Sequence, residues 1–458
     1  MEWQRLLSAK RLGQDGSSPG KMKVRSPFEA DIDRVIFSGA FRRLGRKTQV
    51  HPLAPNDHVH TRLTHSLEVG QVGRDLGKAL GLRIATELPS NIDSHDLGNI
   101  VQSACLAHDI GNPAFGHAGE SAISHWFEVK GRDFFRNMAK EHKRDVSSFE
   151  GNAQGFRMIT QTENHLFTGG LRLTLATLAA GLKYPWSSRK AGAKFGAFIT
   201  EEKILEQVAE TVGLVSKGRH EWCRHPLAFL VEAADDICYA IIDLEDGVEL
   251  GIVSFEEVVE LLTKDFEPSE RRRIQDSFGP REAYRVNLSR LRGPVFDLVI
   301  DSAINGFMKG YEKIMSGNYH GDVFGLVPKS DLGRGIVERS KKFAADRIYG
   351  DQKKVEIELG CYSTFECLLD EFCEAALACA QSLTSHKGEV TIGWKSKLIL
   401  RLLGDHTPSE GNAPPGYHWT EYQCLRRVID FVSGMTDSYA TYVAKQLRGT
   451  GFSGVQRP

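Results

Sequence analysis

The sequence predicts a mainly α-helical protein with at most short strands. Apolar residues recur three or four positions apart in several long stretches, for example at Val69, Val72 and Leu76. This spacing is the period of one face of an α-helix. Residues 354–359 alternate apolar and charged side chains, which favours a short strand there.

The chain is longer than one ordinary hydrophobic core requires, with 458 residues. We therefore divide it into a flexible N-terminal segment (1–25), a helical core (26–250) and a helical C-terminal lobe (251–458). Residues 10–25 are rich in Gly, Ser and basic residues without periodicity, which is typical of a flexible segment. Residues 407–417 are rich in Pro and Gly and are expected to form a long loop.

Composition excludes several classes of protein. The 58 Lys and Arg residues nearly balance the 59 Asp and Glu residues, so the chain is not a polycationic nucleic-acid coat protein, although a local basic patch is compatible with this balance. No apolar run reaches the roughly 18 residues of a membrane span, and the first residues lack the pattern of a secretory signal. The eight cysteines form no CxxC pair. We expect a cytoplasmic protein with reduced thiols and no membrane partner.

The first helix is predicted over residues 26–41. Ser26 is a candidate N-cap, Pro27 stands at the first helical position, and Glu29 would complete a capping box. The cations at 42–47 either form a solvated face or, if they lie beside a metal site, attract a polyphosphate. Residues 121–148 are predicted to form a helix plus a mobile insertion, and further helices are predicted in 171–182, 362–384 and 421–447.

Two histidines lie on the inward stripes of neighbouring helices. His65 stands one turn before Val69, and His108 continues the apolar stripe of Leu97 and Val101. An inward histidine is more often a hydrogen-bonded core residue than a ligand. Two of them on adjacent antiparallel helices are nevertheless what a helix-bundle metal site needs.

The stretch from 105 to 120 carries the densest chemistry. His108 and Asp109 end an apolar run that Gly111 then breaks, and His117 and Glu120 follow three positions apart. Imidazole and carboxylate are ligands for Mg, Mn, Fe or Zn. An isolated His-Asp pair is usually a capping Asp beside a surface His, so the interpretation depends on partners elsewhere in the chain.

Such a partner stands in the helix that begins at 225. Asp235, Tyr239 and Asp243 are four residues apart and form one polar ridge beside an apolar stripe. A carboxylate in such surroundings is costly unless it is paired or bound to a metal. Asp235 is the natural fourth ligand, and Asp236, about 100° round the helix, is the weaker choice.

The ordered pattern of His65, His108-Asp109 and Asp235 resembles the HD superfamily of metal-dependent phosphohydrolases. Flanking stretches resemble the deoxyguanosine triphosphate triphosphohydrolases within it, over roughly residues 25–445. These stretches are 47–50, 62–68, 108–113, 115–120, 183–186, 232–239, 243–247 and 434–437. The resemblance implies an HD-domain helical bundle with an extended helical C-terminal lobe.

The resemblance also implies cleavage of a deoxynucleoside triphosphate at the α-phosphorus, which releases deoxynucleoside and tripolyphosphate. The implied metal ligands are His65, His108, Asp109 and Asp235, and the implied acid/base pair is His117 with Glu120. The implied substrate contacts are Gln49 and Asp243 (3′-hydroxyl), Tyr239 (sugar), and Arg62, Lys183 and the 189–194 loop (triphosphate). The cofactor would be Mg²⁺ or Mn²⁺, with another transition metal as an alternative.

Asn112 indicates the subgroup that acts on dGTP. Many relatives have His at this position, so Asn112 would remove a secondary phosphate contact and no metal ligand. By the same resemblance the protein forms a homo-oligomer, often a hexamer, that controls dNTP pools, with an allosteric dNTP and single-stranded DNA as candidate partners. A broader dNTPase, or an HD nucleotidase or phosphodiesterase, is the alternative enzyme. A regulatory protein that binds nucleotides or single-stranded DNA and has a vestigial site is the non-enzyme alternative.

Overall fold

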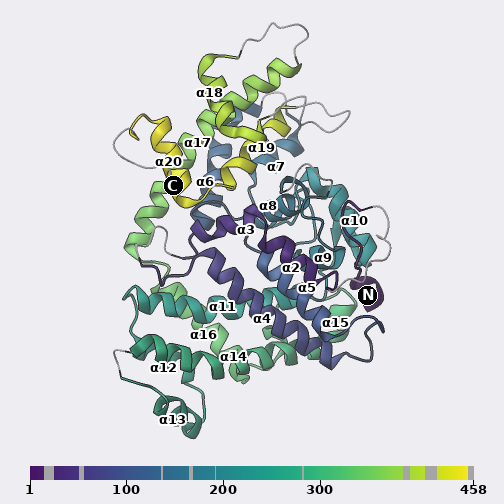
Figure 1. The fold of residues 1–458 in the computed structure, drawn as a ribbon, viewed down its shortest axis with the longest axis vertical. Coiled ribbons are helices and arrows are strands. Elements are labelled where there is room, and N and C mark those ends of the chain that lie inside the picture. Colours follow the sequence, from purple (N-terminus) through teal and green to yellow (C-terminus); the bar gives the residue numbers. More distant parts are fainter. Residues whose placement is uncertain are drawn as a thin grey trace.

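A computed structural model of the chain describes residues 1–14, 25–50, 56–135, 138–163, 169–190, 192–280, 283–384, 392–407 and 420–451. These residues are mainly α-helical, as predicted (Figure 1). Within them the sheet structure is a single small antiparallel hairpin, β1 (Ser216–Gly218) with β2 (Glu221–Trp222). No helix in the described part is long and apolar enough to cross a membrane.

The α-helices are α1 (Trp3–Leu6), α2 (Glu29–Ile36), α3 (Gly39–Arg43), α4 (Arg62–Arg83), α5 (Ser94–Ala107), α6 (Gly116–Val129), α7 (Lys140–Ser147), α8 (Gly151–Arg157), α9 (Leu175–Gly181), α10 (Glu202–Val212), α11 (Ala228–Glu249), α12 (Phe255–Thr263), α13 (Pro268–Asp276), α14 (Tyr284–Lys309), α15 (Tyr311–Met315), α16 (Leu332–Arg347), α17 (Gln352–Thr384), α18 (Trp394–Leu403), α19 (Glu421–Ser433) and α20 (Asp437–Leu447).

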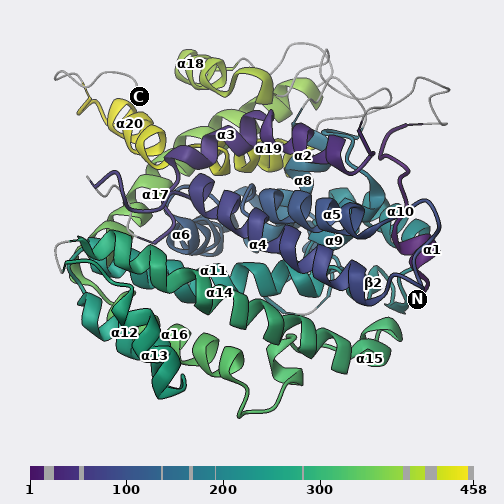
Figure 2. The same cartoon turned by 60° about the horizontal axis from the view of Figure 1, so that its bottom comes forward.

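Helices α4 and α5 pack against each other along their length as an antiparallel pair (Figure 2). Gly73, Gly77 and Gly81 of α4 make this close approach possible. A Cβ at Gly77 would lie 2.7 Å from the carbonyl oxygen of Leu97, and one at Gly81 would lie 2.6 Å from the Cα of Ser94. Because the two backbones come so close, the start of α4 and the end of α5, where His65 and His108 stand, lie side by side.

Two large hydrophobic clusters organise the described residues. The first contains α4, α5, α9, α11, α14 and α16. The second joins α6 and α7 to α17, α18, α19 and α20, which lie in the upper half of Figure 1. Helix α6, which begins just after the His-Asp stretch, therefore packs on C-terminal helices that are distant in sequence. All eight cysteines are unpaired thiols, and seven are buried.

The predicted strand at 354–359 is wrong, because these residues form the beginning of α17. Pairs four residues apart explain the helix. Lys354 forms an ion pair with Glu358 at 2.9 Å, and Gln352 donates to Glu356 at 3.1 Å. Such i,i+4 pairs stabilise a helix and cannot form along one face of a strand.

The predicted boundaries of two other helices shift. Ser26 and Glu29 exchange the expected capping-box hydrogen bonds, but α2 ends at Ile36. The hydroxyl of Ser38 accepts from Phe41 N at 3.1 Å and begins α3. In the 171–182 stretch the Thr174 side chain caps α9, which begins only at Leu175. The predicted flexible segment and the Pro/Gly loop lie largely outside the described residues, at 15–24 and 408–417.

A half-buried histidine gives the fold a pH-dependent contribution to stability. His60 Nδ1 lies 2.7 Å from Asp246 Oδ1, and its Nε2 lies 3.3 Å from Glu68 Oε1. Burial lowers the pKa of His60, but the hydrogen bonds to Asp246 and Glu68 outweigh it and raise the pKa to about 10. This contribution is complete below the unfolded pKa of about 6.5 and is lost as the pH rises through 10.

We expect His60→Gln to lower the free energy of unfolding by about 2 kcal/mol at pH 6, since it removes hydrogen bonds to charged groups. The deficit should shrink toward zero as the pH rises above 10. Denaturant unfolding of wild type and variant at pH 6, 8 and 10.5 measures it. An equal deficit at all three pH values would show that the ionised imidazole is not the cause.

Candidate active site

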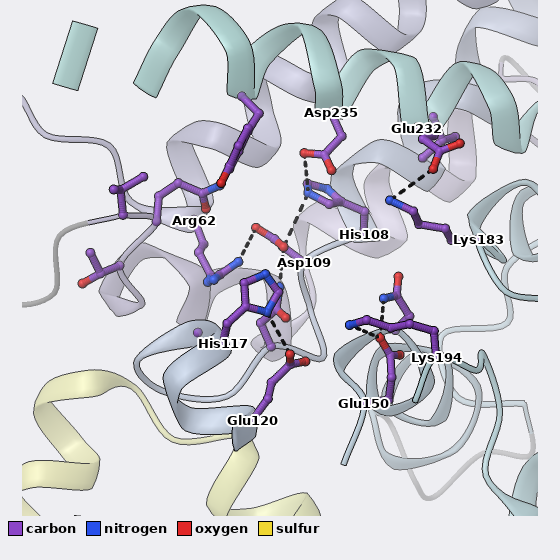
Figure 3. A pocket seen from close by; sticks show the side chains of 18 of the residues that line it. Arg62, His108, Asp109, His117, Glu120, Glu150, Lys183, Lys194, Glu232 and Asp235 are labelled. Atoms are coloured by element: carbon purple, nitrogen blue, oxygen red, sulfur yellow. Dashed lines mark hydrogen bonds and ion pairs between the residues drawn. The ribbon is translucent and has the colours of Figure 1, made fainter. Parts of the chain in front are cut away.

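Four side chains converge on one point, and Figure 3 shows three of them, His108, Asp109 and Asp235. His65 comes from α4, His108 is the C-cap of α5 and is followed by Asp109, and Asp235 comes from α11. Ligand atoms of His65, His108 and Asp109 lie within 4.8 Å of one another. Asp235 Oδ1 lies 3.1 Å from His65 Nε2 and 3.6 Å from His108 Nε2. The structure thus brings together the four residues predicted as metal ligands.

The hydrogen bonds around this cluster fit a bound divalent cation. His108 Nδ1 lies 2.6 Å from the carbonyl oxygen of Cys105. We assign the proton to Nδ1, which leaves the lone pair of Nε2 directed at the cluster. Burial opposes ionisation of Asp235, but His108 and His65 outweigh it and hold the pKa of Asp235 below its ordinary value. Two imidazole nitrogens and two carboxylates are the donor set of Mn, Fe or Zn sites, and the carboxylates also suit Mg.

Asp109 is held from two sides. Arg62 Nη1 lies 2.8 Å from Asp109 Oδ2 as an ion pair, and Asn112 Nδ2 donates to Asp109 Oδ1. Burial raises the pKa of Asp109, but the charges of Arg62 and His108 lower it by a larger amount. The pKa of Asp109 is therefore below its ordinary value. Asn112 therefore orients a candidate ligand, a contact that the sequence did not reveal.

His117 and Glu120 form a hydrogen-bonded pair at the start of α6. His117 Nδ1 lies 2.8 Å from Glu120 Oε2, and Glu120 Oε1 accepts from Gly151 N at 2.7 Å. The His117 side chain is 85% exposed and that of Glu120 12%. A buried carboxylate thus fixes one nitrogen of an accessible imidazole and leaves Nε2 free to exchange a proton with a ligand.

The His-Asp cluster and the His117–Glu120 pair face the same cavity, which has a volume of about 540 Å³. Nine of the eleven predicted site residues line it: Gln49, Arg62, His108, Asp109, His117, Glu120, Lys183, Asp235 and Tyr239. His65 lies behind this surface in the cluster. Asp243 is fully buried and does not line the cavity.

Asp243 contacts the cavity through a tyrosine. Its Oδ2 accepts from the hydroxyl of Tyr349 at 2.5 Å, and the Tyr349 ring packs against Tyr239 with centroids 5.6 Å apart. Burial raises the pKa of Asp243 to about 8. The Oε1 atom of Gln49 is buried without a hydrogen-bond partner among the described residues, which leaves an acceptor for a ligand.

The cations at the cavity are paired with carboxylates. Lys183 Nζ lies 3.3 Å from Glu232 Oε1, and Lys194 Nζ lies 3.2 Å from Glu150 Oε1 (Figure 3). In the predicted phosphate loop, Lys194 lines the cavity, whereas Arg189 pairs with Glu141 and Glu202, and Lys190 with Glu221.

The cations of the basic stretch at 42–47 also lie in different places. Arg43 and Arg46 line a different cavity, beside α19. Lys47 is buried and donates to the carbonyl oxygens of Asn112 and Ser433. Burial lowers the pKa of Lys47 to about 7.

Comparison with known proteins places this site in a family. Residues 62–238 match the HD domain family. The chain is 46% identical to a deoxyguanosinetriphosphate triphosphohydrolase-like protein of Pseudomonas aeruginosa (strain LESB58), over 98% of this chain and 99% of the relative. The chain belongs to the deoxyguanosinetriphosphate triphosphohydrolase-like family of HD-domain proteins.

Other members of this triphosphohydrolase-like family are similar over nearly their whole length. A Synechocystis protein of the same name is 37% identical, over 98% of this chain and 99% of the relative. A deoxyguanosinetriphosphate triphosphohydrolase of Yersinia enterocolitica is 28% identical, over 96% and 97%. HD-domain proteins of this kind are metal-dependent hydrolases, and the His-His-Asp cluster is the candidate metal site here.

Sequence reasoning missed several residues at the cavity of this triphosphohydrolase-like protein. Tyr349, which follows α16, lines it together with Lys354 and Glu358 from the start of α17, and Glu150 and Asn152 line it from the start of α8. The i,i+4 charges of Lys354 and Glu358 are a helix signal that could have replaced the strand prediction. Tyr349 has no local signal, because only the packing of α16 against α11 brings it to Asp243.

Proposed function

We propose that the protein is a metal-dependent deoxynucleoside triphosphate triphosphohydrolase that prefers dGTP and releases deoxynucleoside and tripolyphosphate. The observation that carries the proposal is the shared cavity of the His-Asp cluster and the His117–Glu120 pair. A metal-type site and a proton-transfer group within one cavity suit hydrolysis of a phosphate ester. The name of the Yersinia relative supports the choice of substrate.

The charge of the cavity supports the need for a divalent cation. Six carboxylates line it against four Lys or Arg side chains: Asp109, Glu120, Glu150, Glu232, Asp235 and Glu358 against Arg62, Lys183, Lys194 and Lys354. A triphosphate would be repelled by this excess of negative charge unless cations accompany it. Held by His65, His108, Asp109 and Asp235, a divalent cation would polarise an α-phosphate oxygen and ease deprotonation of the attacking water.

The chain's own residues would carry the remaining steps. Water attacks the α-phosphorus, the bond to the 5′ oxygen breaks, and that oxygen takes up a proton. His117 Nε2 handles the proton at the water or at the 5′ oxygen, while Glu120 holds the ring through Nδ1. Lys183 and Lys194 can turn from their carboxylate partners to the phosphates, which offer stronger charge pairing.

The sugar would lie between Gln49 and the two tyrosines. The buried Oε1 of Gln49 accepts a hydrogen bond from a sugar hydroxyl. Tyr239 packs at a tilted angle against Tyr349, whose hydroxyl Asp243 orients. A 2′-hydroxyl against this aromatic wall would lack a partner, at a cost on the order of 1–3 kcal/mol. Discrimination against ribonucleotides is the expected consequence, and consumption of dNTPs would make pool control the cellular role.

The test is product analysis with manganese and dGTP. We expect tripolyphosphate and deoxyguanosine in equal amounts, the same products more slowly with the other dNTPs, and little turnover of GTP. Orthophosphate or pyrophosphate as product would instead indicate an HD nucleotidase or phosphodiesterase. The panel should be repeated with magnesium, and with each dNTP added as activator, to separate substrate preference from regulation.

A further inference from the structure

One aspartate at the start of α20 joins two segments of the candidate active site. Asp437 is the first residue of α20 and is 2% exposed. Its Oδ2 accepts from Thr48 N at 3.0 Å and from Thr48 Oγ1 at 2.7 Å. Its Oδ1 accepts from Phe115 N at 3.0 Å. The side chain of Thr436 caps the N-terminal end of α20. The Asp437 carboxylate instead binds Phe115 and Thr48, which lie 322 and 389 residues away in sequence.

Each bonded segment presents a residue to the cavity. Thr48 is followed by Gln49, which lines the cavity, and Phe115 lies two residues before His117. Thr48 also forms a bridge with Thr61, next to the start of α4. The position of Asp437 therefore sets the distance between the proposed sugar contact and the proposed proton-transfer group.

The Phe115 turn needs such support. Phe115 has φ 60° and ψ 15°, in the left-handed region that side chains rarely adopt. This conformation costs about 1–2 kcal/mol for a residue with a Cβ. It persists only where the surroundings enforce it, here through the hydrogen bond to Asp437 and the edge-on packing of the ring against Phe365. The turn gives α6 its starting direction and so aims His117.

A second contact holds the same corner. Lys47 Nζ donates to the carbonyl oxygens of Asn112 and Ser433, at 2.5 and 2.8 Å. Ser433 ends α19, four residues before Asp437. The corner between α19 and α20 thus holds residues 47–48 and the 112–115 turn together.

We infer that Asp437 is a positioning residue, which holds Gln49 and His117 in register by binding Thr48 and the strained Phe115 turn. This inference deepens the proposed function and rests on it. It also accounts for the 434–437 stretch, which the metal site and the substrate contacts leave without a role. Because Asp437 acts through His117, its loss should lower kcat more than it raises KM.

The experiment compares Asp437→Asn with a matched control, Asp31→Asn. Asp31 is equally buried, and its Oδ2 accepts from Thr174 N at 3.0 Å and Thr174 Oγ1 at 2.6 Å, as Oδ2 of Asp437 does from Thr48. The Oδ1 atom of Asp31 accepts from Arg11 Nη1 at 2.5 Å, and Asp31 does not line the cavity. We expect Asp437→Asn to lower kcat for dGTP by about 10- to 100-fold and Asp31→Asn to leave it within about twofold. Equal kcat losses in the two variants would overturn the inference.

A double-mutant cycle separates positioning from general damage. In a His117→Ala background the further loss of kcat caused by Asp437→Asn should shrink to the part that acts through Gln49, because His117, one of the two groups that Asp437 positions, is already gone. If Asp437→Asn lowers kcat by the same factor in the wild-type and His117→Ala backgrounds, the inference is overturned. If Asp437→Asn does not fold, Thr48→Val provides a milder change that removes only the 2.7 Å bond. Because that bond holds the segment of Gln49, the loss of kcat caused by Thr48→Val should shrink in a Gln49→Ala background, and an unchanged loss would overturn the inference.

Hydrogen exchange measured by mass spectrometry tests the inference without an activity assay. Peptides covering 44–50 and 113–120 should exchange faster in Asp437→Asn and Asp437→Ala than in wild type, and peptides near 171–177 should do so in Asp31→Asn. Unchanged exchange in the first two peptides would overturn the inference. A wild-type protein that leaves every dNTP intact overturns the proposed function instead, and this exchange comparison still decides the contacts of Asp437.

Discussion

His108→Ala is expected to abolish both turnover and metal content while leaving the fold intact. His108 Nε2 lies within 3.6 Å of both Asp109 and Asp235, so its loss removes the ligand at the centre of the cluster. Bound metal supplies several kcal/mol of transition-state stabilisation, and we therefore expect kcat to fall by at least about 10³-fold. The side chain packs at the wall of a cavity, so truncation costs little core packing.

Bound manganese after dialysis, kcat for dGTP and the thermal midpoint measure this variant. His95→Ala is the matched control, because His95 is exposed on the same helix, α5. The control should keep wild-type values of all three. Full activity or full manganese content in His108→Ala would remove it from the site.

His117→Ala is expected to keep the metal and lose most of its turnover. The His117 side chain is accessible and bonds only Glu120 among the described residues, so its removal leaves the cluster untouched. Proton transfer by a positioned group contributes about 10²–10⁴-fold to rate, and kcat should fall by that factor with KM nearly unchanged.

The companion variant is Glu120→Gln, which keeps the shape of the side chain and its bond from Gly151 but removes the charge that orients His117. It should lose less turnover than His117→Ala, and the double variant should lose no more than His117→Ala alone. Both single variants should bind manganese as wild type does. Unchanged turnover in His117→Ala would show that another group moves the proton.

The fold class was predictable because it depends on local periodicity. The inward stripe of α4 and α5 places His65 and His108 correctly, since side chains three and four residues apart share a helix face. The same reasoning failed at 354–359, where the alternation of apolar and charged residues is compatible with both a strand and a helix. The ion pair between Lys354 and Glu358 stabilises the helix. Short segments of this kind carry too few residues for their period to decide.

The sequence by itself determined the helical class and the residue types that can hold a metal, because both depend on side-chain chemistry and on spacing within one helix. The tertiary structure decided everything that crosses between helices. It placed Tyr349 between Asp243 and the cavity, paired Lys183 with Glu232, and bound Asp437 to Thr48 and Phe115. These contacts join residues about 50 to almost 400 positions apart. No local pattern encodes them, because they arise only when distant helices pack together in the folded chain.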